Sequence, residues 1–437
     1  MSHTPTTVSS DMVIQRIMQL ITDRQLDQAA TLLDAVAAVA HQDPRFHTLH
    51  MMLAEARQQP EQALAAARTA VQKAPHWGPA QLDLALLLGR LGRHEEALVQ
   101  ARHALALAPG QLPVLQSLID LAHQANDLPQ AVQWLTQALA LEPGHRLHLR
   151  LLAGDLSVMG DNAHAIPLFD QLVNSDATDE EALLGRAQAL LAAGRLGESL
   201  RDWDALLLRQ PGNATWQYHR EVARGRTPAT QPTGMVAEIF DQMAGTFDLH
   251  LVQRLQYQLP QQVAGLLLQW HPDRRASVLD LGCGTGLLGA SLGAVDGGLV
   301  GVDASARMLE RAARHGVYAQ LHHGSIMDVL ETTPDARYQV VAALDVFIYL
   351  GALDAVIPAI SRILAPGGRL VFSCEQALPQ EPPWVLRPSG RYAHQQQAVE
   401  ALCRAAGLEQ IEVRQVDLRL QAGEAVKGFL LVARKPG

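Results

Sequence analysis

The sequence predicts an all-α helical solenoid in the N-terminal half of the chain and an α/β domain with a parallel sheet in the C-terminal half. Two observations support this prediction. Helix-breaking residues recur at intervals of 34 residues or twice that, as far as Pro211, which is typical of stacked helical hairpins. A short apolar run at 276–281 then leads into a glycine-rich turn at 282–286, which is typical of alternating strands and helices.

The composition narrows the class of protein. The 437 residues are 48% apolar but only 4% aromatic, so the cores must consist mainly of Ala, Leu and Val. The net charge of −9 disfavours general binding to a nucleic-acid backbone. The three cysteines show no CxxC pair and no metal-ligand spacing, and no stretch reaches about 18 apolar residues in a row. We therefore expect a cytoplasmic protein with no metal, no nucleic-acid partner and no membrane span.

Three series of residues keep the 34-residue interval across the N-terminal half. They are the helix-ending Pro75, Pro109, Pro143 and Pro211, the turn-forming Gly92, Asn126, Gly160 and Gly194, and the small Ala63, Ala97, Ala131 and Ala165. Small residues let two antiparallel helices approach closely, Gly or Asn permits a left-handed turn, and Pro ends the second helix. Because a single hairpin does not bury its apolar face, such hairpins stack into a superhelix with a concave surface.

The pattern resembles the tetratricopeptide repeat family over residues 10–220, through its spacing more than through its residue identities. The resemblance implies a concave groove that binds a protein or peptide partner. A second interpretation stays open, in which the array is a scaffold that covers the catalytic domain or assembles a homo-oligomer.

Residues 221–234 separate this array from a C-terminal domain expected at 235–437. The stretch is rich in Pro, Gly and Thr, which is the composition of a linker. The segment that follows places Phe240 and Phe247 seven residues apart, on one face of a helix. That face either docks the helix on the domain core or caps a cofactor and excludes water.

The glycine turn has the features of a cofactor site. Glycines let the backbone come close to a ligand, and the free amides of the following helix favour a negative group. Position 287 is Leu, so the GxGxxG spacing of nicotinamide and flavin sites is absent, and no GK[ST] follows for a phosphate loop. A second strand ends in Asp303, 23 residues after Asp280, where an acid would hold a ribose diol.

The segments VLDLGCGTGLLG and GVDASARMLERA are similar to motifs I and II of class I S-adenosylmethionine-dependent methyltransferases. The resemblance implies a Rossmann-like domain with a seven-stranded sheet, S-adenosylmethionine as cofactor and S-adenosylhomocysteine as product. It also implies that Asp303 takes the ribose hydroxyls. The residues expected around the methionine part are Asp280, Gly282, Cys283, Gly284 and Gly286, and those expected beside the adenine are Ala304 and Met308.

Later segments fit the same pattern with one departure. Many relatives have an acid after the third strand to hold the adenine amino group, where this chain has Ser325. Either the Ser325 hydroxyl or the backbone at Ile326 would take that role. The fourth strand leads to Asp345, which would lie where the amino group of the cofactor meets the substrate, because ligands bind at the carboxyl ends of such strands. Strands near 408–416 and 428–434 would complete the sheet.

Three residues are candidates for the acceptor pocket. Glu375 closes the fifth strand, and Tyr392 and His394 lie in the segment after it. Methyl transfer from a sulfonium depends mainly on in-line placement of the nucleophile, so a dedicated base is not required. His394 is a candidate proton acceptor, although a histidine in a loop is more often structural.

Over both halves the chain resembles bacterial methyltransferases that carry tetratricopeptide repeats. The acceptor stays open between a protein or peptide recruited by the repeats and a small molecule. An alternative function also stays open, in which the protein is an adaptor whose methyltransferase-like domain binds cofactor without turnover.

Overall fold

The computed structural model describes residues 10–36, 43–244, 258–421 and 424–437. The chain divides into two compact units, Met1–Asp202 and Trp203–Gly437, and each has its own architecture. No helix in the described ranges combines the length and the hydrophobicity needed to span a membrane.

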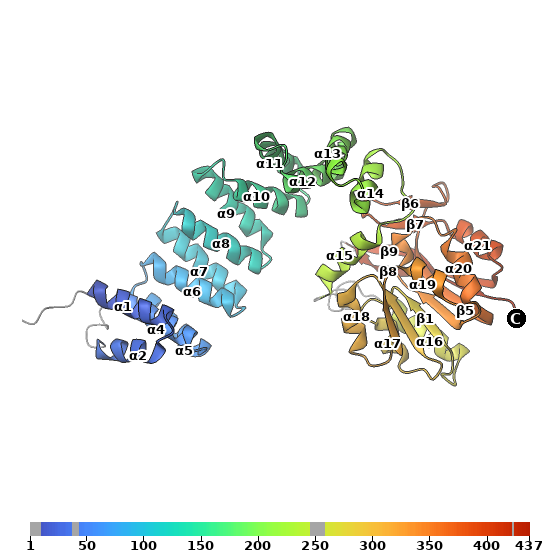
Figure 1. The fold of residues 1–437 in the computed structure, drawn as a ribbon, viewed down its shortest axis with the longest axis horizontal. Coiled ribbons are helices and arrows are strands. Elements are labelled where there is room, and N and C mark those ends of the chain that lie inside the picture. The colour runs from blue at the N-terminus through green and yellow to red at the C-terminus, as the bar shows by residue number, and fades with distance from the viewer. Residues whose placement is uncertain (1–9, 37–42, 245–257, 422–423) are drawn as a thin grey trace, which may run out of the picture. The chain divides into compact units, whose positions relative to one another are not determined.

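Antiparallel pairs of helices make up the first unit (Figure 1). Their bounds are α1 Ser10–Thr22, α2 Leu26–Ala35, α4 Arg45–Ala56, α5 Pro60–Lys73, α6 Gly78–Arg90, α7 His94–Leu107, α8 Leu112–Gln124, α9 Leu128–Leu141, α10 Arg146–Val158, α11 Asn162–Ser175, α12 Glu180–Ala192 and α13 Leu196–Arg209, which crosses into the second unit. From α6 onward alternate helices begin at residues 78, 112, 146 and 180. The predicted 34-residue period of helical hairpins is therefore confirmed.

The residues that define the period occupy the expected places in each hairpin. The turn-forming series has positive φ throughout, from 54° at Asn126 to 82° at Gly160. The small-residue series is buried between helices, and each proline of the helix-ending series follows the end of a second helix by two residues. Close packing extends to Gly185 of α12, where a Cβ atom would lie 2.4 Å from the ring of Phe169 on α11.

After the end of α13, the described part of the second unit continues with further helices and then a nine-stranded sheet. The helices are α14 Ala214–Ala223, α15 Thr233–Met243 and α16 Leu259–Trp270. The strands are β1 Val278–Leu281, β2 Leu299–Asp303, β3 Gln320–His323, β4 Tyr338–Ala343, β5 Leu364–Gln376, β6 Trp384–Leu386, β7 Tyr392–His394, β8 Glu409–Gln421 and β9 Glu424–Arg434. Strands β3-β2-β1-β4-β5 are parallel, β9 runs antiparallel to β5, and β8 pairs with β9.

The predicted count of seven strands is wrong, because β6 and β7 form an additional hairpin that pairs with the end of β5. Each of these strands has only three residues, which is too short for an alternating pattern to be recognised in the sequence. Tyr392 and His394 therefore lie on a strand and not in the loop that the sequence suggested.

Helices cover both faces of the parallel sheet. Helices α16 and α17 (Leu287–Leu292) pack on one face, and α19 (Ile326–Thr332), α20 (Val356–Ile363) and α21 (Gln396–Ala405) pack on the other. Helix α18 (Ala306–Ala313) lies beside β2 and β3. The strands β1, β2 and β4 are almost wholly buried, as expected for parallel strands covered on both faces.

Candidate active site

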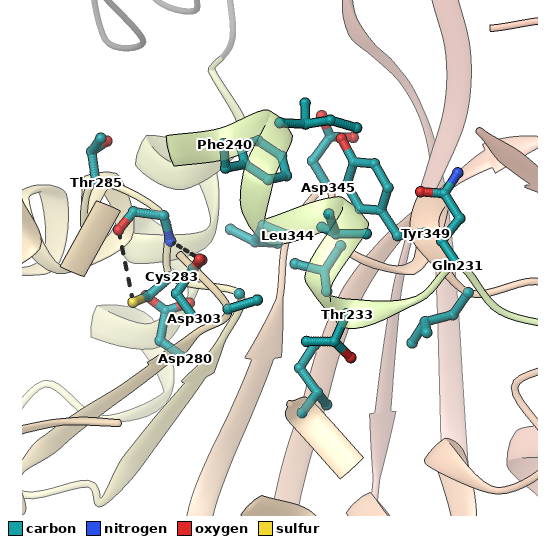
Figure 2. Close-up of a pocket in the computed structure, with 18 of the residues that line it drawn as sticks. Gln231, Thr233, Phe240, Asp280, Cys283, Thr285, Asp303, Leu344, Asp345 and Tyr349 are labelled. Atoms are coloured by element: carbon teal, nitrogen blue, oxygen red, sulfur yellow. Dashed lines mark hydrogen bonds between the residues drawn. The ribbon is translucent and has the colours of Figure 1, made fainter. Parts of the chain in front are cut away.

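A pocket of about 250 Å³ lies at the carboxyl ends of β1, β2 and β4 (Figure 2). This is where open α/β sheets bind their ligands. Its walls combine the glycine turn, the ends of the strands and helix α15. It is lined by Gln231, Thr233, Val236, Ile239, Phe240, Met243, Pro260, Asp280, Gly282, Cys283, Gly284, Thr285, Leu287, Leu288, Asp303, Ala304, Gly324, Ser325, Ile326, Met327, Leu344, Asp345, Val346, Tyr349, Leu350, Arg391 and Arg419.

The turn after β1 has a backbone that requires glycine. Gly282, Gly284 and Gly286 adopt φ values of 64°, 54° and 86°. A Cβ atom at Gly282 would lie 2.4 Å from a methyl carbon of Val346, so the turn also needs glycine for space. Gly282, Cys283 and Gly284 line the pocket, whereas Gly286 does not and is instead the residue that precedes α17.

Asp303 closes β2 and holds the glycine turn in place. One carboxylate oxygen accepts the Gly284 N–H and the other accepts the Ser305 N–H, each at 2.8 Å. Burial raises the pKa of Asp303, and the hydrogen bonds from these two backbone amides oppose that rise. Each oxygen retains further lone pairs, so the carboxylate has capacity for additional hydrogen bonds to a ligand.

Asp280 is more deeply placed, with 3% of its surface exposed. The pKa of Asp280 is raised to about 7. Burial is the largest cause of the rise, the hydrogen bond from Tyr318 lowers the pKa, and the nearby Asp303 carboxylate raises it. The Tyr318 hydroxyl donates to Oδ2 of Asp280 at 2.7 Å. Asp280 therefore changes charge near neutral pH while facing the pocket.

The residues predicted for the adenine end divide into two groups. Ala304, Ser325 and Ile326 line the pocket. The Ser325 hydroxyl accepts the Met327 N–H at 3.1 Å and so caps α19, which leaves its own proton available to a ligand. Met308 is fully buried on the inner side of α18 and does not line the pocket, so the expectation that it contacts the adenine is not supported.

Asp345 lies at the end of the pocket beyond β4, in a charged cluster. Its backbone has a φ of 58°, and its N–H donates to the Ser373 hydroxyl at 2.8 Å. Arg419 of β8 donates to both oxygens of Asp345 and also to Glu375. Glu375 does not line the pocket, so its carboxylate acts on the site through Arg419 and not through direct contact with an acceptor.

Helix α15 forms a further wall of the pocket. Val236, Ile239 and Phe240 line the pocket, and the Phe240 ring meets that of Tyr349 edge to face at 5.5 Å. Asp241 on the same helix accepts the Ser305 hydroxyl and, at 3.2 Å, the Arg307 N–H, so α15 is attached to the start of α18. No residue of α15 is buried, which favours the cap interpretation over the core stripe. Phe247 lies outside the described residues.

Tyr392 and His394 do not line the pocket. Tyr392 is 0% exposed and its hydroxyl donates to the carbonyl of Pro228 at 2.7 Å, while His394 is 1% exposed and pairs through Nε2 with the carbonyl of Gly351 at 3.0 Å. Burial lowers the pKa of His394 to about 4. The expected contact of these side chains with an acceptor is therefore corrected, because both are occupied in holding neighbouring segments together.

The segment that Tyr392 holds through Pro228 is part of the predicted linker. Ala229 accepts the N–H groups of Gly351 and Ala352 at 2.8 and 2.9 Å, and Gln231 N–H donates to the carbonyl of Tyr349 at 3.1 Å. The paired segment runs past Tyr349 and then forms part of the pocket wall, where Gln231 and Thr233 line the pocket. Residues 229–231 are thus fixed to the α/β domain, although their composition is that of a linker.

Sequence reasoning missed several residues of the site. Arg419 and Tyr318 belong to no motif, and they reach the site only because β8 and the segment before β3 lie beside it. Tyr349 and Arg391 line the pocket and are hydrogen-bonded to each other through their side chains. The one signal available in the sequence was Arg419 itself, an arginine flanked by apolar residues in DLRLQ, because an arginine buried in a strand needs a charged partner. Among the described residues, no group of His, Cys, Asp and Glu side chains is arranged to hold a metal ion.

Comparisons with known proteins identify a methyltransferase domain around this pocket. Residues 278–368 match the protein family described as "Methyltransferase domain". A ubiquinone biosynthesis O-methyltransferase of Bordetella avium (strain 197N) is 24% identical over 209 residues, which cover 43% of this chain and 84% of the relative. The protein of the same name from Vibrio atlanticus (strain LGP32) is 37% identical over 101 residues, which cover 22% of this chain and 42% of the relative.

A solved structure from Thermotoga maritima, described as a SAM-dependent methyltransferase and possible histamine N-methyltransferase, is 17% identical with a TM-score of 0.34. The aligned region covers 46% of this chain and 99% of that one. The chain spans less than half the length of several curated relatives that it matches. The motifs and the family match together show that the C-terminal part contains a methyltransferase domain, and that the protein is a methyltransferase enzyme.

Proposed function

We propose that the protein transfers a methyl group from S-adenosylmethionine to an oxygen atom of a small, largely apolar acceptor. The observation that supports this most directly is the Asp303 carboxylate at the end of β2, buried against the glycine turn with hydrogen-bonding capacity still directed at the pocket. A ribose diol is the chemical group that two such oxygens would hold.

The residues present fit this cofactor along the whole pocket. Val346 leaves no room for a side chain at Gly282, so a ligand that approaches here would meet the backbone of the turn. Asp280 and the turn would hold the methionine part, and Ser325 or the backbone of Ile326 would hold the adenine amino group. When bound, S-adenosylmethionine supplies an electrophilic methyl group on a sulfonium. The chain would bind the donor, orient the acceptor and exclude water from the pocket.

The acceptor end of the pocket supports a small molecule of apolar character. Val236, Ile239, Phe240 and Leu350 give it an apolar wall, and the ring of Tyr349 extends that wall. Gln231 and Arg391 add polar groups that could fix the orientation of an acceptor. The two relatives described above are ubiquinone biosynthesis O-methyltransferases, which favours oxygen as the atom that receives the methyl group.

For the N-terminal helices we propose a tetratricopeptide-type array that binds a protein or peptide partner or assembles copies of the chain. The 34-residue period of its hairpins supports this assignment. Under this proposal the array contributes to recruitment or assembly, and the chemistry is confined to the C-terminal domain.

Calorimetric titration with S-adenosylmethionine tests the cofactor site. We expect micromolar binding by the wild-type protein and at least ten-fold weaker binding by Asp303→Ala, equivalent to about 1.4 kcal/mol. Asp296→Ala, which removes an exposed carboxylate, is the matched control and should bind like the wild type. Absence of binding by the wild type would overturn the proposal. Binding without conversion of S-adenosylmethionine into S-adenosylhomocysteine in the presence of any phenol, carboxylic acid or peptide offered as acceptor would favour the adaptor alternative.

A further inference from the structure

Tyr318 reaches the site from the far side of β2. It lies just before β3, and the N–H of the next residue, Ala319, donates to the carbonyl of Leu299 at 2.8 Å, which places it beside β2. Asp280 is on β1, one strand further across the sheet order β3-β2-β1. The Tyr318 hydroxyl nevertheless lies 2.7 Å from Asp280 Oδ2. Its side chain therefore extends across β2 to reach the carboxylate.

Three glycines leave room for the Tyr318 ring. Gly301 on β2 is the register partner of Asp280, and a Cβ atom there would lie 2.9 Å from the ring. A Cβ atom at Gly289 in α17 would lie 2.5 Å from it, and one at Gly286 would lie 3.0 Å from it. A side chain at 289 or 301 would thus displace the ring. The three glycines come from the turn, the following helix and the neighbouring strand, and all three face the same phenol.

We propose that Tyr318 is a positioning residue of the cofactor site, which fixes the carboxylate of Asp280 and favours its ionised form when the methionine end of the cofactor binds. The inference rests on the proposed function, because it takes Asp280 to face that end of S-adenosylmethionine. A phenol bound to one carboxylate oxygen restricts the rotation of Asp280 and leaves the other oxygen directed elsewhere. The positive amino group of the cofactor would bind more tightly to an ionised carboxylate than to a neutral one.

The charged and titratable groups around Asp280 come from each neighbouring element. Asp303 faces it from β2, Cys283 from the glycine turn and Tyr318 from the segment before β3. Burial raises the pKa of both Cys283 and Tyr318 well above their ordinary values, so these two groups stay neutral near pH 7. Asp303 opposes the ionisation of Asp280, and the hydrogen bond from Tyr318 favours it. Tyr318 is thus the neighbour that holds Asp280 toward its charged state.

Tyr318→Phe tests the inference, because it keeps the ring and removes only the hydroxyl. The affinity for S-adenosylhomocysteine is measured by calorimetry between pH 5.5 and 9.5. For the wild type we expect the affinity to rise with pH, with the midpoint of the rise near pH 7. In Tyr318→Phe that midpoint should move upward by roughly one to two pH units, because a hydrogen bond to the charged form has been lost. At pH 6.5 this corresponds to about ten-fold weaker binding or more.

Two further variants separate positioning from simple packing. Gly289→Ala should shift the midpoint in the same direction, since its Cβ atom displaces the phenol, although alanine is ordinarily the better residue inside a helix. Tyr338→Phe removes a hydroxyl from another buried tyrosine, on β4, and should leave the midpoint unchanged.

In an Asp280→Asn background, Tyr318→Phe should have no further effect on the pH dependence, because the titrating group is gone.

The outcomes distinguish this inference from the proposed function. Binding by the wild type with the same midpoint in Tyr318→Phe would overturn the positioning role and leave the proposed function intact. Absence of S-adenosylhomocysteine binding by the wild type at every pH would overturn the proposed function and the inference with it. A shift confined to Tyr318→Phe and Gly289→Ala, and absent in Tyr338→Phe, would support both.

Discussion

One nitrogen of the Arg419 guanidinium donates to both carboxylate oxygens of Asp345, at 2.8 and 2.9 Å. The second terminal nitrogen donates to Glu375 on β5. Arg419 is 4% exposed and lies where the pairing of β8 with β9 shifts register, and such irregularities redirect side chains. A residue late in the chain therefore fixes the conformation of a pocket residue 74 positions earlier.

Replacement of Arg419 should destabilise the protein strongly. Arg419→Met leaves two carboxylates, Asp345 and Glu375, without their cation in a buried place, and we expect the free energy of unfolding to fall by about 3–5 kcal/mol. Adding Glu375→Gln should restore part of this loss. Chemical denaturation at pH 7 provides the measurement, with the exposed Arg414→Met on the same strand as control. A loss no larger than that of the control would show that the cluster contributes little.

The stability of the ligand-free protein should depend on pH through Asp280. Its pKa is raised from 3.8 to about 7 in the folded protein, so the folded state binds more protons than the unfolded state between these values. The free energy of unfolding therefore falls as pH rises from about 4 to 7, by up to roughly 4 kcal/mol from this group.

Asp280→Asn should remove that part of the pH dependence and be more stable than the wild type at pH 8. Urea denaturation at pH 5 and pH 8 measures the difference for both proteins. If the wild type and Asp280→Asn lose the same stability between the two pH values, Asp280 is ionised throughout and the expectation is wrong.

His394 should contribute to stability without affecting cofactor binding. Its pKa is lowered to about 4, so the folded state takes up fewer protons than the unfolded state below pH 6.5, and stability falls as pH decreases from about 6.5 to 4. In His394→Gln this decline should be smaller, while affinity for S-adenosylmethionine stays within about two-fold of the wild type. The exposed His322→Gln is the control. A large loss of affinity in His394→Gln would return this residue to the site.

Two glycines within repeat helices should respond to alanine in opposite directions. At Gly185 the new Cβ atom would lie 2.4 Å from the Phe169 ring, so Gly185→Ala should lower the melting temperature. A Cβ atom at Gly154 would meet nothing within 4 Å apart from its chain neighbours and the backbone of its own helix, so Gly154→Ala should raise stability by up to about 1 kcal/mol through helix propensity. Thermal unfolding of the full chain compares the two variants. Equal effects would mean that close packing between α11 and α12 is not limiting.

The glycine turn and the repeat period could be predicted from the sequence because both depend on local chemistry. Positive φ values at Gly282, Gly284 and Gly286 follow from the residue type, and so does the left-handed turn at Asn126. The short hairpin of β6 and β7 was missed because three-residue strands take their definition from the partner strand and not from their own pattern.

The helical period, the parallel α/β unit and the acids near the ends of β1 and β2 could be inferred from the sequence alone, since each is specified by residues within one element or turn. The folded arrangement was needed to show that Arg419 contacts Asp345, that Tyr318 contacts Asp280, and that Tyr392 and His394 hold backbone segments instead of facing an acceptor. These relationships depend on which strands become neighbours and on the space that glycines leave between them. Neither property is encoded in the spacing of residues along the chain.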